Sequence, residues 1–146
     1  MTTYADGSAL IRRIVEQDGS EVAAVIWDRA EVVASSAIAV TEARAAIAEA
    51  NRAGQLDGHA LHEAACALER VSADASVIAV DTKLAAVAGG LAEQHGLGAN
   101  DALHLAAALS LDAPRVVVAT WSAGLASAAA DCGMAVVPRQ PAPVAA

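Results

Sequence analysis

The fold class is decided by one stretch near the carboxyl end of the chain, VVVATWS at residues 116–122. Its first four residues form a short apolar and β-branched run, which is typical of a strand buried in a sheet. Ser122 can cap a helix, and an alanine-rich run follows it up to Gly133, where such a helix would end. Residues 135–137 have the pattern of a further strand. A strand, a helix and a strand in this order predict parallel strands joined by a helix.

The same alternation extends over the rest of the chain. Strands are predicted at residues 3–5, 32–35, 76–80, 116–119 and 135–137. Helices are predicted at residues 8–16, 21–30, 38–52, 58–71, 82–94, 101–111 and 123–132, with Asn100 as the cap of the sixth. The sequence therefore predicts a three-layer α/β fold, in which helices flank a central, mostly parallel sheet of four to five strands.

The chain is expected to form one domain. Its 146 residues suit a single unit, and no repeat or internal boundary interrupts the alternation. Three of the four prolines lie between residues 138 and 146. We therefore expect a domain over residues 1–138 and a flexible tail over residues 139–146.

Composition limits the functional classes. The net charge is −8 and aromatic residues make up only 2% of the chain, so a broad basic or base-stacking surface for nucleic acid is not expected. An acidic pocket can still meet a phosphate through a bound cation. A negative net charge also suits a basic protein partner.

No stretch has the length and apolarity of a membrane span, and residues 1–4 do not resemble a secretion signal. The two cysteines, Cys66 and Cys132, lack metal-binding spacing. We interpret them as reduced and mostly buried thiols of a cytoplasmic protein that has no membrane contact.

Candidate site residues follow from the predicted sheet, because parallel sheets carry their sites at the carboxyl ends of the strands. One group comes directly after the predicted strands, and two further acidic residues lie in helices that could reach the same rim. These candidates are Asp6, Ser8, Thr120 and Ser122 after strands, and Glu42 and Asp101 in helices.

Each acid alone has a simpler interpretation. Asp6 could cap the first helix, which is as good an explanation as catalysis. Glu42 could be exposed and paired with Arg44 or Arg52, which its residue type alone favours. Asp101 lies in a first helical turn, where the helix dipole favours a carboxylate.

The histidines give little independent signal. His104 lies one turn after Asp101, and we expect it to be packed and hydrogen-bonded without a catalytic role. His59 and His62 are three residues apart and could bind a metal, but no third ligand is evident, so surface histidines are expected. A phosphate-binding domain is disfavoured as well, since the loop at residues 6–8 is too short and too acidic.

Four stretches, taken in order, resemble the motifs of one family. They are YADGSAL at residues 4–10, SSAIAVTEAR at 35–44, LGANDALHLA at 97–106 and VVVATW at 116–121. The first is similar to the opening of a PIN domain, and the third resembles the family's D-A-L-H-L-A motif. Over residues 3–138 the chain resembles the PIN-domain family, in particular the VapC-type toxins of bacterial toxin–antitoxin pairs.

The resemblance implies a metal-dependent endoribonuclease that cleaves single-stranded regions of RNA as the toxin of such a pair. It implies that Asp6, Glu42 and Asp101 are catalytic and hold Mg²⁺ or Mn²⁺. The hydroxyls that would support these acids or face the phosphate are Ser8, Thr120 and Ser122. A cognate antitoxin and a second copy of the chain are the protein partners that it implies.

Two positions depart from the family pattern. Position 7 is Gly7 where threonine is usual, and Ser122 occupies a position where many members carry a fourth acid. Neither Asp112 nor Asp131 is placed to replace that acid. We therefore expect either one metal ion or a second ion held mainly by the substrate. The alternative is a catalytically degenerate PIN-like module that binds RNA or a protein without cleaving.

Overall fold

The computed structural model describes residues 1–139, so most of the predicted tail, residues 140–146, lies outside the described residues. The strands form a five-stranded sheet in the order β3-β2-β1-β4-β5, in which each neighbouring pair is parallel. They are β1 (Thr2–Ala5), β2 (Val32–Ser36), β3 (Ser76–Ile78), β4 (Val116–Ala119) and β5 (Ala135–Val137). The predicted α/β fold with a central parallel sheet is confirmed.

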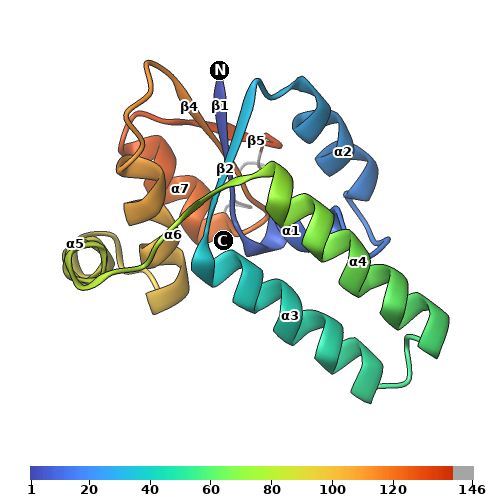
Figure 1. The fold of residues 1–146 in the computed structure, drawn as a ribbon. Coiled ribbons are helices and arrows are strands. Elements are labelled where there is room, and N and C mark those ends of the chain that lie inside the picture. The colour runs from blue at the N-terminus through green and yellow to red at the C-terminus, as the bar shows by residue number, and fades with distance from the viewer. Residues whose placement is uncertain (140–146) are drawn as a thin grey trace, which may run out of the picture.

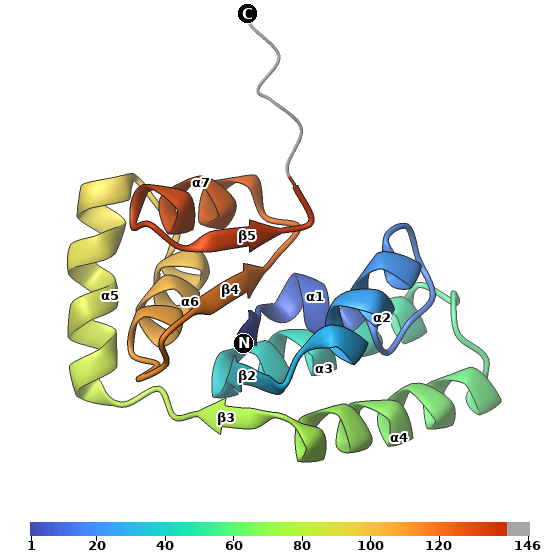
Figure 2. The ribbon, with the colours of Figure 1, turned by 90° about the horizontal axis from the view of Figure 1, so that it is seen from above.

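Helices cover both faces of this sheet (Figures 1 and 2). They are α1 (Gly7–Arg12), α2 (Ser20–Arg29), α3 (Ala37–Arg52), α4 (Gly58–Asp74), α5 (Thr82–His95), α6 (Ala99–Leu109) and α7 (Ala123–Asp131). Helices α5, α6 and α7 lie on one side, with α5 packed on α6, while α1 to α4 lie on the other (Figure 2). Helices α3 and α4 lie side by side and extend away from the sheet (Figure 1).

The strands supply side chains alternately to two cores, as the pleat of a strand requires. Tyr4 belongs to the core beneath α6 and α7, together with Leu105 and Leu125, and all three are at most 1% exposed. The next residue, Ala5, packs with Ala9 in a second core on the opposite side. Most other buried residues are alanine and valine.

The parallel register of β1 and β4 positions the candidate site. Ala5 is paired with Ala119, so both strands end at the same level of the sheet. The backbone N–H of Asp6 donates to the carbonyl oxygen of Ala119 at 3.2 Å. Asp6 and Thr120 therefore leave the sheet next to each other, as the rule for parallel strands predicts.

The predicted end of the first helix at residue 16 is wrong, since α1 ends at Arg12. The apolar spacing misled the prediction, because Ile14 and Val15 pack against the core of α3 and α4 from a turn rather than from a helix. Arg12 stabilises that turn by donating its Nε–H to the carbonyl oxygen of Asp18 at 2.9 Å, and Gly19 follows with a positive φ.

The predicted cap of the sixth helix is also wrong. Gly98 is the N-cap of α6, and Asn100 already lies inside the helix. The Asn100 side chain instead donates to Glu42 at 3.1 Å, which makes it part of the site. By contrast, Asp81 caps α5 directly before the predicted helix start at residue 82, accepting from the backbone N–H of Leu84 at 2.8 Å.

Within residues 1–139, none of the helices combines the length and the apolarity needed to cross a membrane.

Candidate active site

Asp6 lies at the centre of the candidate site and is only 3% exposed. Its Oδ1 accepts from the hydroxyl of Ser8 at 2.7 Å and from the backbone N–H of Ala9 at 2.9 Å. Its Oδ2 accepts from the hydroxyl of Thr120 at 2.5 Å. Asp6 therefore does cap α1, as the simpler interpretation held, but Oδ2 faces the end of β4 and has no part in capping.

Hydroxyl groups connect Asp6 to Asp101. The buried Thr120 hydroxyl, which donates to Asp6, accepts from the backbone N–H of Ser122 at 2.9 Å. The Ser122 hydroxyl donates to Asp101 Oδ2 at 2.7 Å. Ser122, at the sequence position where a fourth acid is common in the family that the chain resembles, thus binds the carboxylate of Asp101. Its hydroxyl also caps α7 by accepting from the N–H of Leu125 at 3.3 Å.

Glu42 reaches the same rim from α3. The ring nitrogen Nε2 of His104 lies 2.7 Å from Glu42 Oε2, and Asn100 donates to Oε1. A Cβ atom placed on Gly7 would lie 2.8 Å from Glu42 Cδ, so the Glu42 carboxylate lies directly against the residue that follows Asp6. The expected pairing of Glu42 with Arg44 or Arg52 is wrong, because α3 turns this side chain inward, where it is 28% exposed.

The three acids and three hydroxyls named from the sequence therefore gather at one edge of the sheet. His104 is packed and hydrogen-bonded as expected, but its bond to Glu42 makes it part of the same network. Sequence reasoning missed Tyr4, whose hydroxyl lies 2.8 Å from His104 Nδ1. It also missed Asn100 as a partner of Glu42. The sequence offered one weak signal for each residue. Asn100 directly precedes Asp101, and His104, which contacts Tyr4, follows Asp101 by three residues.

Asp6 is a buried carboxylate that forms no ion pair with another of the described residues. Across residues 1–139, the ion pairs involve other carboxylates, so neither Asp6 nor Asp101 has a basic side chain within pairing distance. Burial raises the pKa of Asp6, and the hydrogen bonds from Ser8, Thr120 and Ala9 only oppose this effect. A cation bound near Asp6 would compensate the cost of burying its charge.

This cost predicts that Asp6→Asn stabilises the metal-free protein. Because the folded-state pKa is raised, Asp6 favours folding only while it is protonated, and that contribution is lost as the pH rises through the folded-state pKa. The variant should therefore have the higher melting temperature at neutral pH, and the difference should shrink toward about pH 4, where a carboxyl group protonates. Thermal denaturation in a chelator over this range measures the effect.

Asp57→Asn is the matched control for this prediction. Asp57 caps α4 with the same bond, accepting from the N–H of Ala60 at 2.8 Å, but it is exposed. Asparagine and aspartate cap helices about equally well, so the control should barely change the melting temperature at any pH. Equal behaviour of the two variants would show that burial of Asp6 carries no electrostatic cost.

The donor set fits a hard divalent cation. Within the described part of the chain, no three histidine, cysteine or carboxylate side chains converge closely enough to hold a metal ion by themselves. Mg²⁺ does not require such a cage, because it usually binds one or two carboxylates and keeps several waters. The carboxylates of Asp6 and Asp101, joined through Thr120 and Ser122, provide oxygen ligands of this kind.

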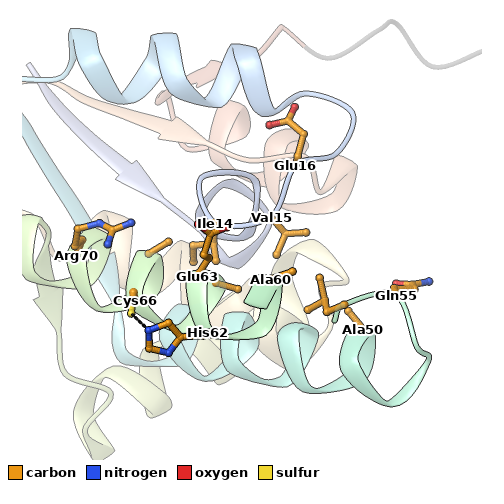
Figure 3. Close-up of a pocket in the computed structure, with 13 residues that line it drawn as sticks. Ile14, Val15, Glu16, Ala50, Gln55, Ala60, His62, Glu63, Cys66 and Arg70 are labelled. Carbon is orange, nitrogen blue, oxygen red and sulfur yellow. Dashed lines mark hydrogen bonds between the residues drawn. The ribbon is translucent and has the colours of Figure 1, made fainter. Parts of the chain in front are cut away.

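A separate groove of about 750 Å³ lies between the end of α1 and the α3–α4 pair (Figure 3). None of the six predicted site residues lines it. His62 points toward Cys66, with 3.6 Å between Nε2 and Sγ, and His59 pairs with Glu63 on the surface. The expectation of surface histidines is confirmed, whereas Cys66 and Cys132 are partly exposed free thiols rather than mostly buried ones.

Comparison with known proteins places these observations in a family. A family model described as PIN domain matches residues 3–120. Two curated relatives from Mycobacterium tuberculosis, Ribonuclease VapC45 of strain CDC 1551 / Oshkosh and Ribonuclease VapC49 of strain ATCC 25618 / H37Rv, are each 35% identical over 137 residues. Each match covers 94% of this chain and 95% of the relative. The crystal structure of PAE2754 from Pyrobaculum aerophilum has a TM-score of 0.68 at 24% identity, covering 94% of this chain and 92% of that one.

Proposed function

The chain belongs to the PIN-domain family, and from this we propose that it is a ribonuclease that hydrolyses phosphodiester bonds in single-stranded regions of RNA. The observation that carries the proposal is the buried carboxylate of Asp6, which is joined through two hydroxyls to Asp101 and lacks a basic partner among the described residues. The ribonuclease names of the two relatives support the same activity.

Asp6 and Asp101 would hold Mg²⁺ or Mn²⁺, with Glu42 binding it directly or through a water. When bound, such an ion acidifies a water and neutralises charge on the scissile phosphate. Ser8 and Thr120 hold the two carboxylate oxygens of Asp6 by hydrogen bonds and so fix the direction in which that side chain points.

Ser122 limits the number of divalent ions that the proposed site can bind. Its hydroxyl donates to Asp101, so it orients one metal ligand and adds no negative charge of its own. A site with three carboxylates suits one divalent ion better than two, because each further ion needs further anionic oxygens. We therefore expect a single resident ion, with any second ion held mainly by the phosphate of the substrate.

The resemblance to VapC-type toxins implies that the activity is controlled by an antitoxin. The net charge of −8 suits a partner that presents basic side chains to the acidic rim. A homodimer is proposed on the same ground as the antitoxin, by family resemblance.

The competing proposal is a degenerate PIN-like module that binds RNA or a protein and does not cleave. Only Ser122, in place of a fourth acid, favours it. Calorimetric titration of the purified chain with Mn²⁺ distinguishes the nuclease from the degenerate module. The nuclease would bind the ion with Asp6 and Asp101, so a saturable heat of binding is expected in the wild type and should be lost in Asp101→Asn. A wild type that binds no Mn²⁺ would favour the degenerate module.

A further inference from the structure

A chain of hydrogen bonds runs from the interior of the protein to the acidic rim. It starts at Tyr4, which is fully buried, and passes through His104, which is 1% exposed. The Tyr4 hydroxyl lies 2.8 Å from Nδ1 of the ring, and Nε2 lies 2.7 Å from Glu42 Oε2. Nδ1 also lies 3.5 Å from the hydroxyl of the buried Ser36. Both ring nitrogens therefore have partners, and of the three partners only Glu42 belongs to the acidic rim.

The chemistry of the partners sets the direction of these bonds. An ionised carboxylate can only accept, so Nε2 must carry a proton and donate it to Glu42. In the neutral ring Nδ1 is then the acceptor, and Tyr4 is the donor. Burial raises the pKa of Tyr4, so its hydroxyl keeps the proton that this bond needs. The Glu42 carboxylate thus fixes the tautomer of His104, and the Tyr4 hydroxyl supplies the donor that this tautomer needs at Nδ1.

Gly7 provides the space for this arrangement. A Cβ atom at this position would lie 2.8 Å from Glu42 Cδ and closer still to Oε2. At such distances the Glu42 carboxylate would have to move away. The backbone of Gly7 does not need glycine for its own conformation, since its φ is not positive. The absence of a side chain at Gly7 is therefore what allows the Glu42 carboxylate to lie inward and reach His104.

We propose that His104 is a positioning residue of this site, which holds the Glu42 carboxylate over Gly7 and beside Asp6 in the arrangement that the metal ion requires. The inference rests on the proposed function. Partners that orient a metal ligand typically change metal affinity about 10- to 100-fold when they are removed, because the ligand must then be ordered on binding. Asn100 also donates to Glu42, but at 3.1 Å and from an exposed position.

The test compares His104→Met with His104→Gln. Both side chains are unbranched and similar in size, but only glutamine has an N–H that can donate to Glu42. By calorimetric titration, Mn²⁺ affinity should fall about 10- to 100-fold in His104→Met and stay close to wild type in His104→Gln. The RNA cleavage rate at saturating Mn²⁺ should fall less than the affinity. If His104 had a merely structural role, His104→Gln should be the more damaging variant for Mn²⁺ affinity, since a buried glutamine costs more stability than a buried methionine.

Gly7→Ala tests the same geometry without changing His104. Alanine is a better helix former than glycine, so α1 should form readily, yet the new Cβ would displace Glu42. Mn²⁺ affinity should fall as it does in His104→Met, and the double variant should be little worse than either single one. If His104→Met fails to fold, Gly7→Ala still tests whether the inward position of Glu42 is needed for Mn²⁺ affinity.

Nitrogen NMR of the metal-free protein supplies a readout independent of the ion, and should show the His104 ring proton on Nε2. A proton confined to Nδ1, or unchanged Mn²⁺ affinity in both His104→Met and Gly7→Ala, would overturn the proposal while leaving the nuclease intact. A wild type that neither binds Mn²⁺ nor cleaves RNA would instead remove the proposed function, and this inference with it.

Discussion

Asp6→Asn is expected to lower the rate of RNA cleavage by about 10³-fold or more while the protein stays folded. A metal ion contributes several kcal/mol of charge stabilisation, and each 1.4 kcal/mol is worth about tenfold in rate. Asparagine removes the negative charge that holds the ion. It keeps an oxygen for the hydroxyl of Ser8 and the N–H of Ala9, whereas its amide nitrogen would donate to Thr120, which now donates to Asp6. The bonds that cap α1 therefore survive the substitution.

Initial rates of cleavage in excess Mg²⁺ measure this effect, with Asp57→Asn as the control. That substitution makes the same chemical change at an equivalent helix cap on α4, away from the acidic rim. The control should cleave at the wild-type rate. Comparable activity in Asp6→Asn and the wild type would remove Asp6 from the mechanism.

Leu105→Ala is expected to lower the free energy of unfolding by about 2–5 kcal/mol. Leu105 is fully buried in α6, where it packs in the same core as Tyr4 and Val118. Removing its side chain leaves a cavity in this core, and the surrounding structure relaxes only partly to fill it. Since domains are stable by only about 5–15 kcal/mol, this is a large part of the total.

Urea denaturation measures this loss, and Leu109→Ala is the matched control. Leu109 ends the same helix but is 43% exposed, so the same substitution should cost less than about 0.5 kcal/mol. Below its melting transition, Leu105→Ala should still cleave RNA, because no site residue is changed. Equal losses of stability in the two variants would contradict the position of Leu105 in the core.

Much of the fold follows from local patterns. The stretch at residues 116–122 forms β4 and the cap of α7 as predicted, because β-branched runs bury well in sheets and serine caps helices. The end of α1 does not follow from such patterns. Ile14 and Val15 keep a helical spacing but are packed by a turn that depends on Arg12 reaching the carbonyl oxygen of Asp18.

The candidate site divides in the same way. The positions of Asp6 and Thr120 follow from the rule that parallel strands end at one edge, which needs only the strand predictions. The partner of Glu42 could not be predicted, because His104 is 62 residues away and meets it only where α3 and α6 converge. The role of Gly7 depends on that same contact, so its sequence position alone carries no signal.

The measurement that tests the proposed activity most directly is cleavage of a pool of structured RNAs by the purified, partner-free chain, in Mg²⁺, in Mn²⁺ and in EDTA. The proposed function predicts cuts in single-stranded regions that require either metal, stop in EDTA and disappear in Asp6→Asn. Folded protein that leaves the RNA intact under all three conditions, or cuts it equally well in EDTA, would contradict a metal-dependent ribonuclease.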